Sequence, residues 1–220
     1  MNQIITVDGP AGSGKSTVSR TLAKKIRYAY LDTGAMYRAV ALVAKREGVH
    51  MEDGKRLGSL CRSLNLRFES DEDPPRLLLD DEDITELIRS PELDMLSSKV
   101  SAVMEVREAM VELQREMAEG GKFVAEGRDM GTVVFPEAAN KFYLTASTHV
   151  RAGRRYRERL ARGETVQEAA VEQDLKKRDY QDQTRSVSPL RPAADALILD
   201  STALDVEEVV EIMINHIKRN

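Results

Sequence analysis

The run Asp8-Gly-Pro-Ala-Gly-Ser-Gly-Lys-Ser16, near the start of the chain, carries the residue types that hold phosphate groups. With this spacing, backbone N–H groups surround phosphate oxygens, the lysine reaches the β and γ oxygens of a nucleoside triphosphate, and the serine hydroxyl is a ligand for Mg²⁺. We therefore expect Lys15 to act in catalysis and Ser16 to be the metal ligand. The residues expected to bind the triphosphate are Gly9, Pro10, Ala11, Gly12, Ser13, Gly14, Lys15, Ser16 and Thr17.

The sequence on either side of this loop supports that interpretation. An apolar run at residues 4–7 predicts a strand directly before it, and residues 17–26 predict a helix whose positive end faces the bound anion. Gly9, Gly12 and Gly14 let the chain turn tightly around a phosphate. A glycine-rich turn that binds nothing would not need a strand and a helix in this order.

A second group of functional residue types lies at residues 151–162, which contain six arginines and only one acidic residue, Glu158. On a helix, one face would carry Arg151, Arg155, Arg159 and Arg162. Like charges so placed destabilise an isolated helix, so we expect other groups to compensate them. The stretch is either an exposed basic face or a lid that closes over nucleotide phosphates, and the glycine loop favours the lid.

Further arginines lie beside hydrogen-bonding residues where predicted strands end, which is where sheets of this kind bind ligands. Arg38 closes the run that begins at Asp32, and Arg128 with Asp129 follows the third predicted strand. One helical face could present Arg178, Asp182 and Arg185 together. Each of these arginines also has an ordinary surface ion-pair interpretation. Together with the glycine loop, they favour a second anion pocket.

An acceptor that is itself a phosphate would explain two anion pockets. A kinase for an alcohol needs a carboxylate to accept the hydroxyl proton. A phosphate monoester has its second pKa near ~6, so its attacking oxygen is mostly ionised at neutral pH. What is needed instead is fixed cations that bring two polyanions together and stabilise the transferring phosphoryl group. The excess of arginine fits that need.

The elements that must position these residues alternate between strand and helix, which predicts a parallel sheet covered on both faces. We expect strands at residues 3–7, 28–31, 122–125, 141–146 and 196–199. We expect helices at residues 15–26, 37–47, 98–119, 147–162, 165–183 and 205–219. The last helix begins with Asp205 and Glu208, a spacing typical of a capping box.

Between the second and third strands lies a segment that predicts a small antiparallel hairpin inserted into the α/β core. Apolar residues alternate with polar ones from Leu64 to Phe68, residues 71–75 form a turn, and residues 76–79 form a second apolar run. The acidic tips at residues 69–73 and 80–83 could be a metal site, but carboxylates in an unpatterned cluster are more typical of a solvated loop.

Composition limits the remaining classes of function. The 220 residues are 41% hydrophobic and 32% charged with a net charge of −4, which predicts a soluble globular protein and argues against a nucleic-acid binder held by bulk positive charge. No export signal or run of about 18 apolar residues is evident, so we expect a cytoplasmic location. Cys61 is the only cysteine, which excludes an internal disulfide and favours a buried apolar role.

Over almost its whole length the sequence resembles the bacterial-type cytidylate kinases, of the nucleoside monophosphate kinase group. The motifs that carry the resemblance are the glycine loop, Asp32-Thr-Gly-Ala-Met-Tyr-Arg38, Glu126-Gly-Arg-Asp-Met-Gly-Thr-Val-Val134, Arg178-Asp-x-x-Asp182-x-x-Arg185 and Ser188-Pro-Leu-x-Pro-Ala-Ala-Asp-Ala196. The resemblance implies transfer from ATP to CMP or dCMP with Mg²⁺, by a monomeric cytoplasmic enzyme. It also implies a P-loop fold whose five-stranded parallel sheet has the order 2-3-1-4-5.

The resemblance also assigns roles to residues. Arg38, Arg128 and Arg185 would bind the acceptor phosphate, and Thr33 and Tyr37 would line the pocket. The cytosine ring would be bound by Ser98, Arg107 and Asp129. The ribose would face Arg178 and Asp182. Catalysis would involve Lys15, Arg128, Asp129 and Arg154, with Arg154 covering the phosphates when the lid closes.

Three regions follow from these assignments. Residues 1–32, 96–150 and 186–220 would form the P-loop core, residues 33–95 the monophosphate-binding region with its hairpin, and residues 151–185 the lid with the following helix. Two positions depart from the family pattern: Glu126 replaces a common aspartate, and Thr33 stands where some members have serine.

Alternatives to this assignment differ in the acceptor or in the class of protein. The nearest is a P-loop kinase for UMP, AMP or another small acceptor. A GTPase switch is disfavoured because the chain lacks the tetrapeptide Asn-Lys-x-Asp. A nucleic-acid-binding role for residues 151–162 is also disfavoured by the overall charge.

Overall fold

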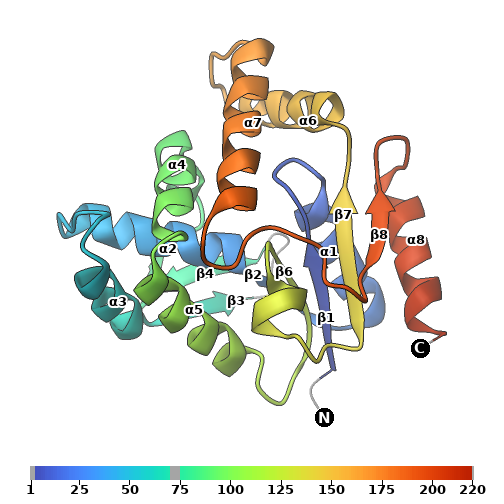
Figure 1. The fold of residues 1–220 in the computed structure, drawn as a ribbon, viewed down its shortest axis with the longest axis horizontal. Helices are drawn as coiled ribbons and strands as arrows, with labels where there is room; N and C mark the ends of the chain where they lie inside the picture. Colours follow the sequence, from blue (N-terminus) through green and yellow to red (C-terminus); the bar gives the residue numbers. More distant parts are fainter. Residues whose placement is uncertain (1–2, 70–74, 220) are drawn as a thin grey trace.

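A computed structural model of the protein describes residues 3–69 and 75–219, and it is built around a five-stranded parallel sheet (Figure 1). The strands are β1 (Gln3–Asp8), β2 (Ala29–Asp32), β6 (Lys122–Gly127), β7 (Asn140–Thr145) and β8 (Leu197–Asp200). Their spatial order is β2-β6-β1-β7-β8, and every neighbouring pair is parallel. Numbered along the chain among themselves, these five strands have the expected order 2-3-1-4-5.

Helices cover both faces of this sheet because successive strand residues point to opposite sides. In β1, Ile4 belongs to the apolar core on one face, whereas Ile5 and Val7 belong to the core on the other. The core on the first face includes residues of α2 (Thr33–Arg46), α3 (Gly54–Ser63), α4 (Pro91–Val100) and α5 (Met104–Met117), with α3 packed against α5 and α4 against α2. The second packs against α1 (Lys15–Ile26) and α8 (Val206–Ile217). The predicted capping box of α8 is confirmed.

The central helices differ from the prediction. The single helix expected at residues 98–119 is wrong, because α4 ends at Val100 and α5 begins at Met104. Ser90 caps α4 and Pro91 follows at its first position, a start signal that the sequence already carried. Helix α2 begins four residues earlier than expected, since the Asp32 side chain accepts a hydrogen bond from the Ala35 N–H. Helix α3 was not predicted.

The inserted hairpin is present as a small antiparallel sheet with one more strand than expected. Its strands are β3 (Leu66–Glu69), β4 (Arg76–Leu79) and β5 (Glu82–Asp83), in the order β3-β4-β5. Of the turn predicted at residues 71–75, residues 71–74 lie outside the described residues. At the second acidic tip, Glu82 forms an ion pair with Arg46. The described residues hold no acidic, histidine or cysteine cluster suited to a metal ion.

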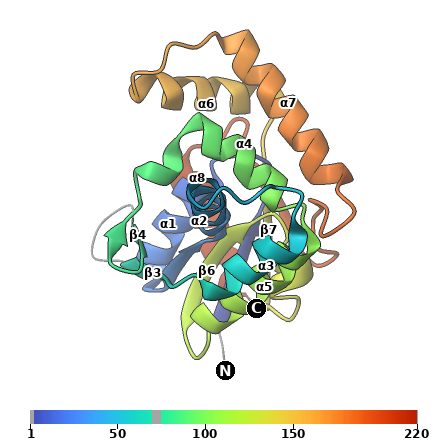
Figure 2. The ribbon, with the colours of Figure 1, turned by 90° about the vertical axis from the view of Figure 1, so that its left-hand side faces the viewer.

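Two helices stand together beyond the carboxyl ends of the strands (Figures 1 and 2). Helix α6 (Thr148–Ala161) follows β7 after the cap residue Ser147, and α7 (Glu168–Thr184) packs against it. In Figure 2, α4 lies directly beneath them, so the elements that carry the predicted site residues meet above the sheet. The remaining short elements are a 3₁₀ turn at Leu87–Arg89 and a π-helical turn at Met130–Val134.

Candidate active site

The glycine loop connects β1 to α1, and β7 and α6 pack closely against it. Gly9, Gly12 and Gly14 all have positive φ angles, a conformation that other residues rarely adopt. A Cβ atom on Gly9 would lie 2.0 Å from the Leu144 carbonyl oxygen, and one on Gly12 would lie 2.8 Å from the Arg151 carbonyl oxygen. Glycine is therefore needed here both for backbone conformation and for the close approach of β7 and α6.

Lys15 begins α1 and is folded back over the loop. Its Nζ donates a hydrogen bond to the Pro10 carbonyl oxygen at 3.2 Å, and the side chain is buried. Burial, with the positive charge of Arg128 nearby, lowers the pKa of Lys15 to about 7. A phosphate group would reverse this shift by supplying the missing negative charge, so the lysine is poised for an anion.

Ser16 lies beside a buried carboxylate on the neighbouring strand. Its hydroxyl donates to Glu126 Oε1 at 2.7 Å, and the Tyr30 hydroxyl donates to the same oxygen at 2.8 Å. Burial and the nearby Asp32 raise the pKa of Glu126. The other oxygen, Oε2, is buried and has no hydrogen-bond partner among the described residues. A hydroxyl and a carboxylate oxygen in this arrangement fit Mg²⁺, whose other ligands would be phosphate and water oxygens.

Asp8, at the end of β1, fixes the segment that carries Arg128 and Asp129. Its two carboxylate oxygens accept hydrogen bonds from the Met130 and Gly131 N–H groups, both at 2.8 Å. Burial raises the pKa of Asp8 to about 7 although the two backbone hydrogen bonds favour the charged form. Asp8 was not predicted as a functional residue, although its position at a carboxyl strand end was a usable signal.

Beside the glycine loop, the structure brings all the predicted acceptor-binding residues into one pocket. The pocket includes Thr33, Tyr37, Arg38, Ser98, Arg107, Arg128, Asp129, Arg178, Asp182 and Arg185. They come from α2, α4, α5 and α7 and from the segments that follow β6 and α7. Their roles remain predictions, but their convergence from distant parts of the sequence is a structural finding.

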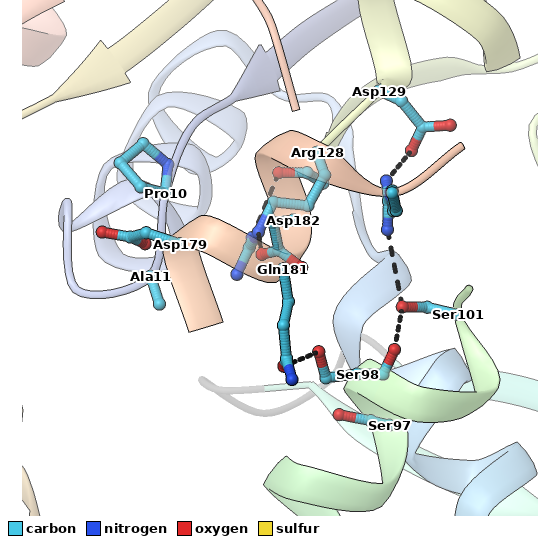
Figure 3. Close-up of polar contacts among 12 residues, drawn as sticks. Pro10, Ala11, Ser97, Ser98, Ser101, Arg128, Asp129, Asp179, Gln181 and Asp182 are labelled. Atoms are coloured by element: carbon cyan, nitrogen blue, oxygen red, sulfur yellow. Dashed lines mark hydrogen bonds and ion pairs between the residues drawn. The ribbon is translucent and has the colours of Figure 1, made fainter. Parts of the chain in front are cut away.

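Within this pocket, carboxylates hold several of the guanidinium groups in place. Arg128 Nε donates to Asp182 Oδ2 at 2.8 Å (Figure 3). Arg107 forms a buried ion pair with Asp129. Arg107 also lies over the Tyr37 ring, 5.6 Å from its centre. These fixed positions leave the pocket with rigid cations, which suits recognition of a planar base and an anion.

Three other predicted residues of the pocket differ in how they are held. The Ser98 hydroxyl donates to Gln181 Oε1 at 3.5 Å, which connects α4 to α7 (Figure 3). Arg185 Nε donates to the Ser188 carbonyl oxygen at 2.6 Å, and Arg178 Nε is buried without a partner among the described residues. Burial and the charge of Arg128 lower the pKa of Arg178 to about 10. An anion in the pocket would remove the strain of these crowded positive charges.

The four arginines predicted to share one helical face are compensated by ion pairs, as expected, and one of them is buried. Ion pairs connect Arg151 with Asp179, Arg155 with Asp94 and Glu158, Arg159 with Glu164, and Arg162 with Glu158. Arg151 is not part of an exposed face, because its side chain is buried and donates to the Ala11 carbonyl oxygen at 3.0 Å. It supports the glycine loop from outside.

Arg154 reaches the far side of the same loop. Its Nη1 donates to the Ser13 carbonyl oxygen at 3.2 Å, and its Nη2 donates to the Ser201 carbonyl oxygen at 2.7 Å. Arg154, Arg155 and Arg162 line a cavity of about 820 Å³ that also includes the loop. The cavity fits the lid interpretation of this helix better than a basic face turned to solvent.

The molecule has two adjoining sites: a loop suited to nucleotide phosphates and a pocket of fixed guanidinium groups. This combination is typical of P-loop kinases that act on an anionic acceptor. A family model described as cytidylate kinase matches residues 5–219, and the chain belongs to this family. The resemblance noted from the motifs is thereby confirmed.

Curated relatives agree with this membership. A protein named cytidylate kinase from Carboxydothermus hydrogenoformans is 47% identical over 215 residues, which cover 98% of this chain and 97% of the relative. Another of the same name, from Vibrio cholerae, is 44% identical and covers 98% of this chain and 96% of its own. The chain is therefore a kinase of the nucleoside monophosphate kinase group.

A solved structure supports the fold alone. An uncharacterised protein from Eubacterium ventriosum superposes with a TM-score of 0.54 at 14% identity, covering 100% of both chains. Among the described residues, no helix has the length and apolar character needed to cross a membrane.

Proposed function

We propose that the enzyme transfers the γ-phosphoryl group of ATP to CMP or dCMP, giving ADP and CDP or dCDP. The observation that carries this proposal is that the two cavities meet at shared residues. Both are lined by Lys15, Ser16, Asp32, Arg38, Arg128 and Arg178. A donor phosphate on the glycine loop and an acceptor phosphate among the arginines would therefore lie next to each other.

The chemistry needs no general base, since the acceptor phosphate is mostly ionised at neutral pH. One of its oxygens attacks the γ-phosphorus, a new P–O bond forms, and the bond from the γ-phosphorus to the bridging oxygen breaks, leaving the electron pair on ADP. Lys15 and Arg128 would stabilise the charge that builds on the transferring group, and Arg154 would cover it from α6. Mg²⁺, held by Ser16 with Glu126 beside it, would neutralise charge on the β- and γ-phosphates.

The pocket also offers a reason to choose cytosine. Ser98, Arg107 and Asp129 are assigned to the base, and a carboxylate accepts well from the exocyclic amino group that uracil lacks. A site built to hydrogen-bond such a group rejects the analogue without it, because buried polar atoms are then left unpaired. We assign Arg178 and Asp182 to the ribose, while Arg38, Arg128 and Arg185 bind the phosphate.

A coupled ADP-release assay against CMP, dCMP, UMP, AMP and shikimate tests the proposal. We expect CMP and dCMP to have the highest kcat/KM values. Preference for UMP or AMP over CMP would overturn the assignment of the base-binding residues, and preference for the alcohol would overturn the whole proposal. The enzyme is proposed to act as a cytoplasmic monomer, for which sedimentation should give a mass near 24.6 kDa.

A further inference from the structure

Asp94, on α4, contacts one arginine of the acceptor pocket and one arginine of α6. Its Oδ1 accepts a hydrogen bond from Arg38 Nε at 2.8 Å, and its Oδ2 forms an ion pair with Arg155 Nη2. The Asp94 side chain is only 14% exposed, and it lines the large cavity that also contains the glycine loop.

The contact with Arg38 is made through one edge of the guanidinium group. Among the described residues, the bond from Nε to Asp94 is the only one in which the Arg38 side chain donates. Nη1 and Nη2 therefore keep their N–H groups for another acceptor, and these two nitrogens form the fork that binds phosphate oxygens in pairs. The carboxylate thus fixes the plane of the fork without occupying it.

The carboxylate can perform this task only if it stays ionised. Burial works against the charged form of Asp94, but the neighbouring guanidinium groups, Arg38 foremost, outweigh it and hold the pKa of this carboxyl below its usual value. Because α2 packs against α4, the carboxylate is also held by rigid elements on both sides of the contact. A fixed, charged partner orients Arg38 before any ligand binds.

The contact with Arg155 extends this arrangement to α6. Arg155 also pairs with Glu158 at 2.7 Å, but that pair lies within α6. The ion pair with Asp94 is the contact by which Arg155 connects α6 to α4. A second link between these regions runs from Arg162 Nη1 to the Arg89 carbonyl oxygen at 3.1 Å. Of the two, only the Asp94 contact also involves an arginine assigned to the acceptor phosphate.

We propose that Asp94 is a positioning residue that sets Arg38 for the acceptor phosphate and couples it to Arg155 of α6. The inference rests on the proposed function, since it takes Arg38 to bind that phosphate. Asp94 does not make the pocket unfavourable for the acceptor phosphate, because its single negative charge is shared between the two positive charges of Arg38 and Arg155. Removal of Asp94 frees the fork of Arg38 to rotate away from the phosphate and removes the ion pair by which Arg155 of α6 is connected to Arg38.

A double-mutant cycle on CMP kinetics and CMP binding tests this role. We expect Asp94→Asn, which keeps the side-chain size, to raise the CMP KM and the calorimetric Kd for CMP by about tenfold, as for loss of a charged hydrogen bond. Asp94→Ala should raise them at least as much. In an Arg38→Ala background, neither change should raise the CMP KM further, because the residue that Asp94 positions is already absent.

The control variant is Glu92→Gln on the same helix. Glu92 forms an ion pair with Lys45 at 2.6 Å, but this pair is exposed and lies outside both cavities. We expect it to leave the CMP KM unchanged, and thermal unfolding identifies any variant that fails to fold. A folded Asp94 variant with the wild-type CMP KM, or effects of Asp94 and Arg38 that multiply, would overturn the inference. Wild-type enzyme that does not phosphorylate CMP would instead overturn the proposed function.

Discussion

Ser16 and Glu126 are 110 positions apart in the chain, yet the hydroxyl of one donates to the carboxylate of the other at 2.7 Å. The pairing of β1 with β6 produces this contact, since Val7 lies opposite Glu126 and the glycine loop begins just beyond. Glu126 replaces the aspartate common in the family and is longer by one methylene group. The hydrogen bonds from Ser16 and Tyr30 both go to Oε1, which leaves the buried Oε2 without a hydrogen-bond partner among the described residues.

Glu126→Gln should therefore weaken the use of Mg²⁺ while leaving the fold intact. The amide keeps an oxygen that can accept from Ser16 but loses the negative charge beside the metal position. We expect kcat to fall about tenfold or more, as for other lost electrostatic groups in active sites. The Mg²⁺ concentration needed for half-maximal ATP binding, measured by calorimetry, should rise. Glu112→Gln, exposed on α5, is the control, and an unchanged Mg²⁺ requirement in Glu126→Gln would refute the metal assignment.

Tyr30→Phe tests whether the second hydrogen bond orients Glu126. Removal of the hydroxyl leaves Oε1 with Ser16 alone, so the carboxylate gains freedom to rotate. We expect a smaller rise in the Mg²⁺ requirement than for Glu126→Gln, with the KM for CMP unchanged. Tyr28→Phe is a matched control, because Tyr28 also donates to a side-chain oxygen, Gln3 Oε1 at 2.8 Å, but on the surface. Equal behaviour of the two variants would show that Tyr30 has no orienting role.

These contacts explain what the sequence could and could not predict. The glycine loop was predictable because its chemistry is carried by neighbouring residues whose backbone conformation is set locally. The strand order came from the family resemblance, since local pattern does not specify which strands pair. Tyr30 and Asp94 were missed because each owes its importance to a partner brought near by the sheet or by helix packing, and neither lies in a recognisable spacing.

The helix boundary that was missed at α4 and the unforeseen burial of Arg151 on α6 have a similar physical cause. A continuous helical pattern at residues 98–119 hid the turn between Val100 and Met104, although Ser90 and Pro91 signalled a separate start upstream. The spacing of arginines on α6 described the helix face correctly. It could not show that Arg151 is buried, because the groups that bury it belong to the glycine loop and α7.

Lys15→Met should change how stability depends on pH. Burial, with Arg128 nearby, lowers the folded-state pKa of Lys15 from 10.5 to about 7, so the folded protein binds fewer protons than the unfolded chain between these values. Burial of the charged Lys15 therefore destabilises the fold most below pH 7. This penalty shrinks as pH rises from 7 toward 10.5, with a slope of up to about 1.4 kcal/mol per pH unit.

We accordingly expect Lys15→Met to be more stable than wild type at pH 6, with the difference shrinking toward pH 9. Urea unfolding monitored by circular dichroism at several pH values measures the difference in unfolding free energy between variant and wild type. The same variant should lose phosphoryl transfer. Lys25→Met, an exposed lysine of α1, is the control for removal of a charge. A Lys15→Met protein less stable than wild type at pH 6 would contradict the expected burden of this buried charge.

Arg151→Ala should destabilise the fold rather than act only on catalysis. The Arg151 guanidinium donates to the carbonyl oxygens of Ala146 and Ala11, both at 3.0 Å, and pairs with Asp179 at 2.7 Å. Its removal leaves a poorly solvated carboxylate on α7 and unsupported carbonyl groups at the loop, which costs about 3–5 kcal/mol for a buried pair. The free energy of unfolding from urea titration measures this loss.

The double variant Arg151→Ala, Asp179→Ala separates the two parts of that cost. Because the second change removes the unpaired carboxylate, it should restore part of the stability but not the ATP affinity, which depends on support of the glycine loop through Ala11. Arg157→Ala, on the same helix but exposed, should have little effect on either quantity. If Arg151→Ala instead keeps wild-type stability and weakens only turnover, Arg151 belongs to the mobile lid as the sequence suggested, and its buried contacts contribute nothing measurable to the fold.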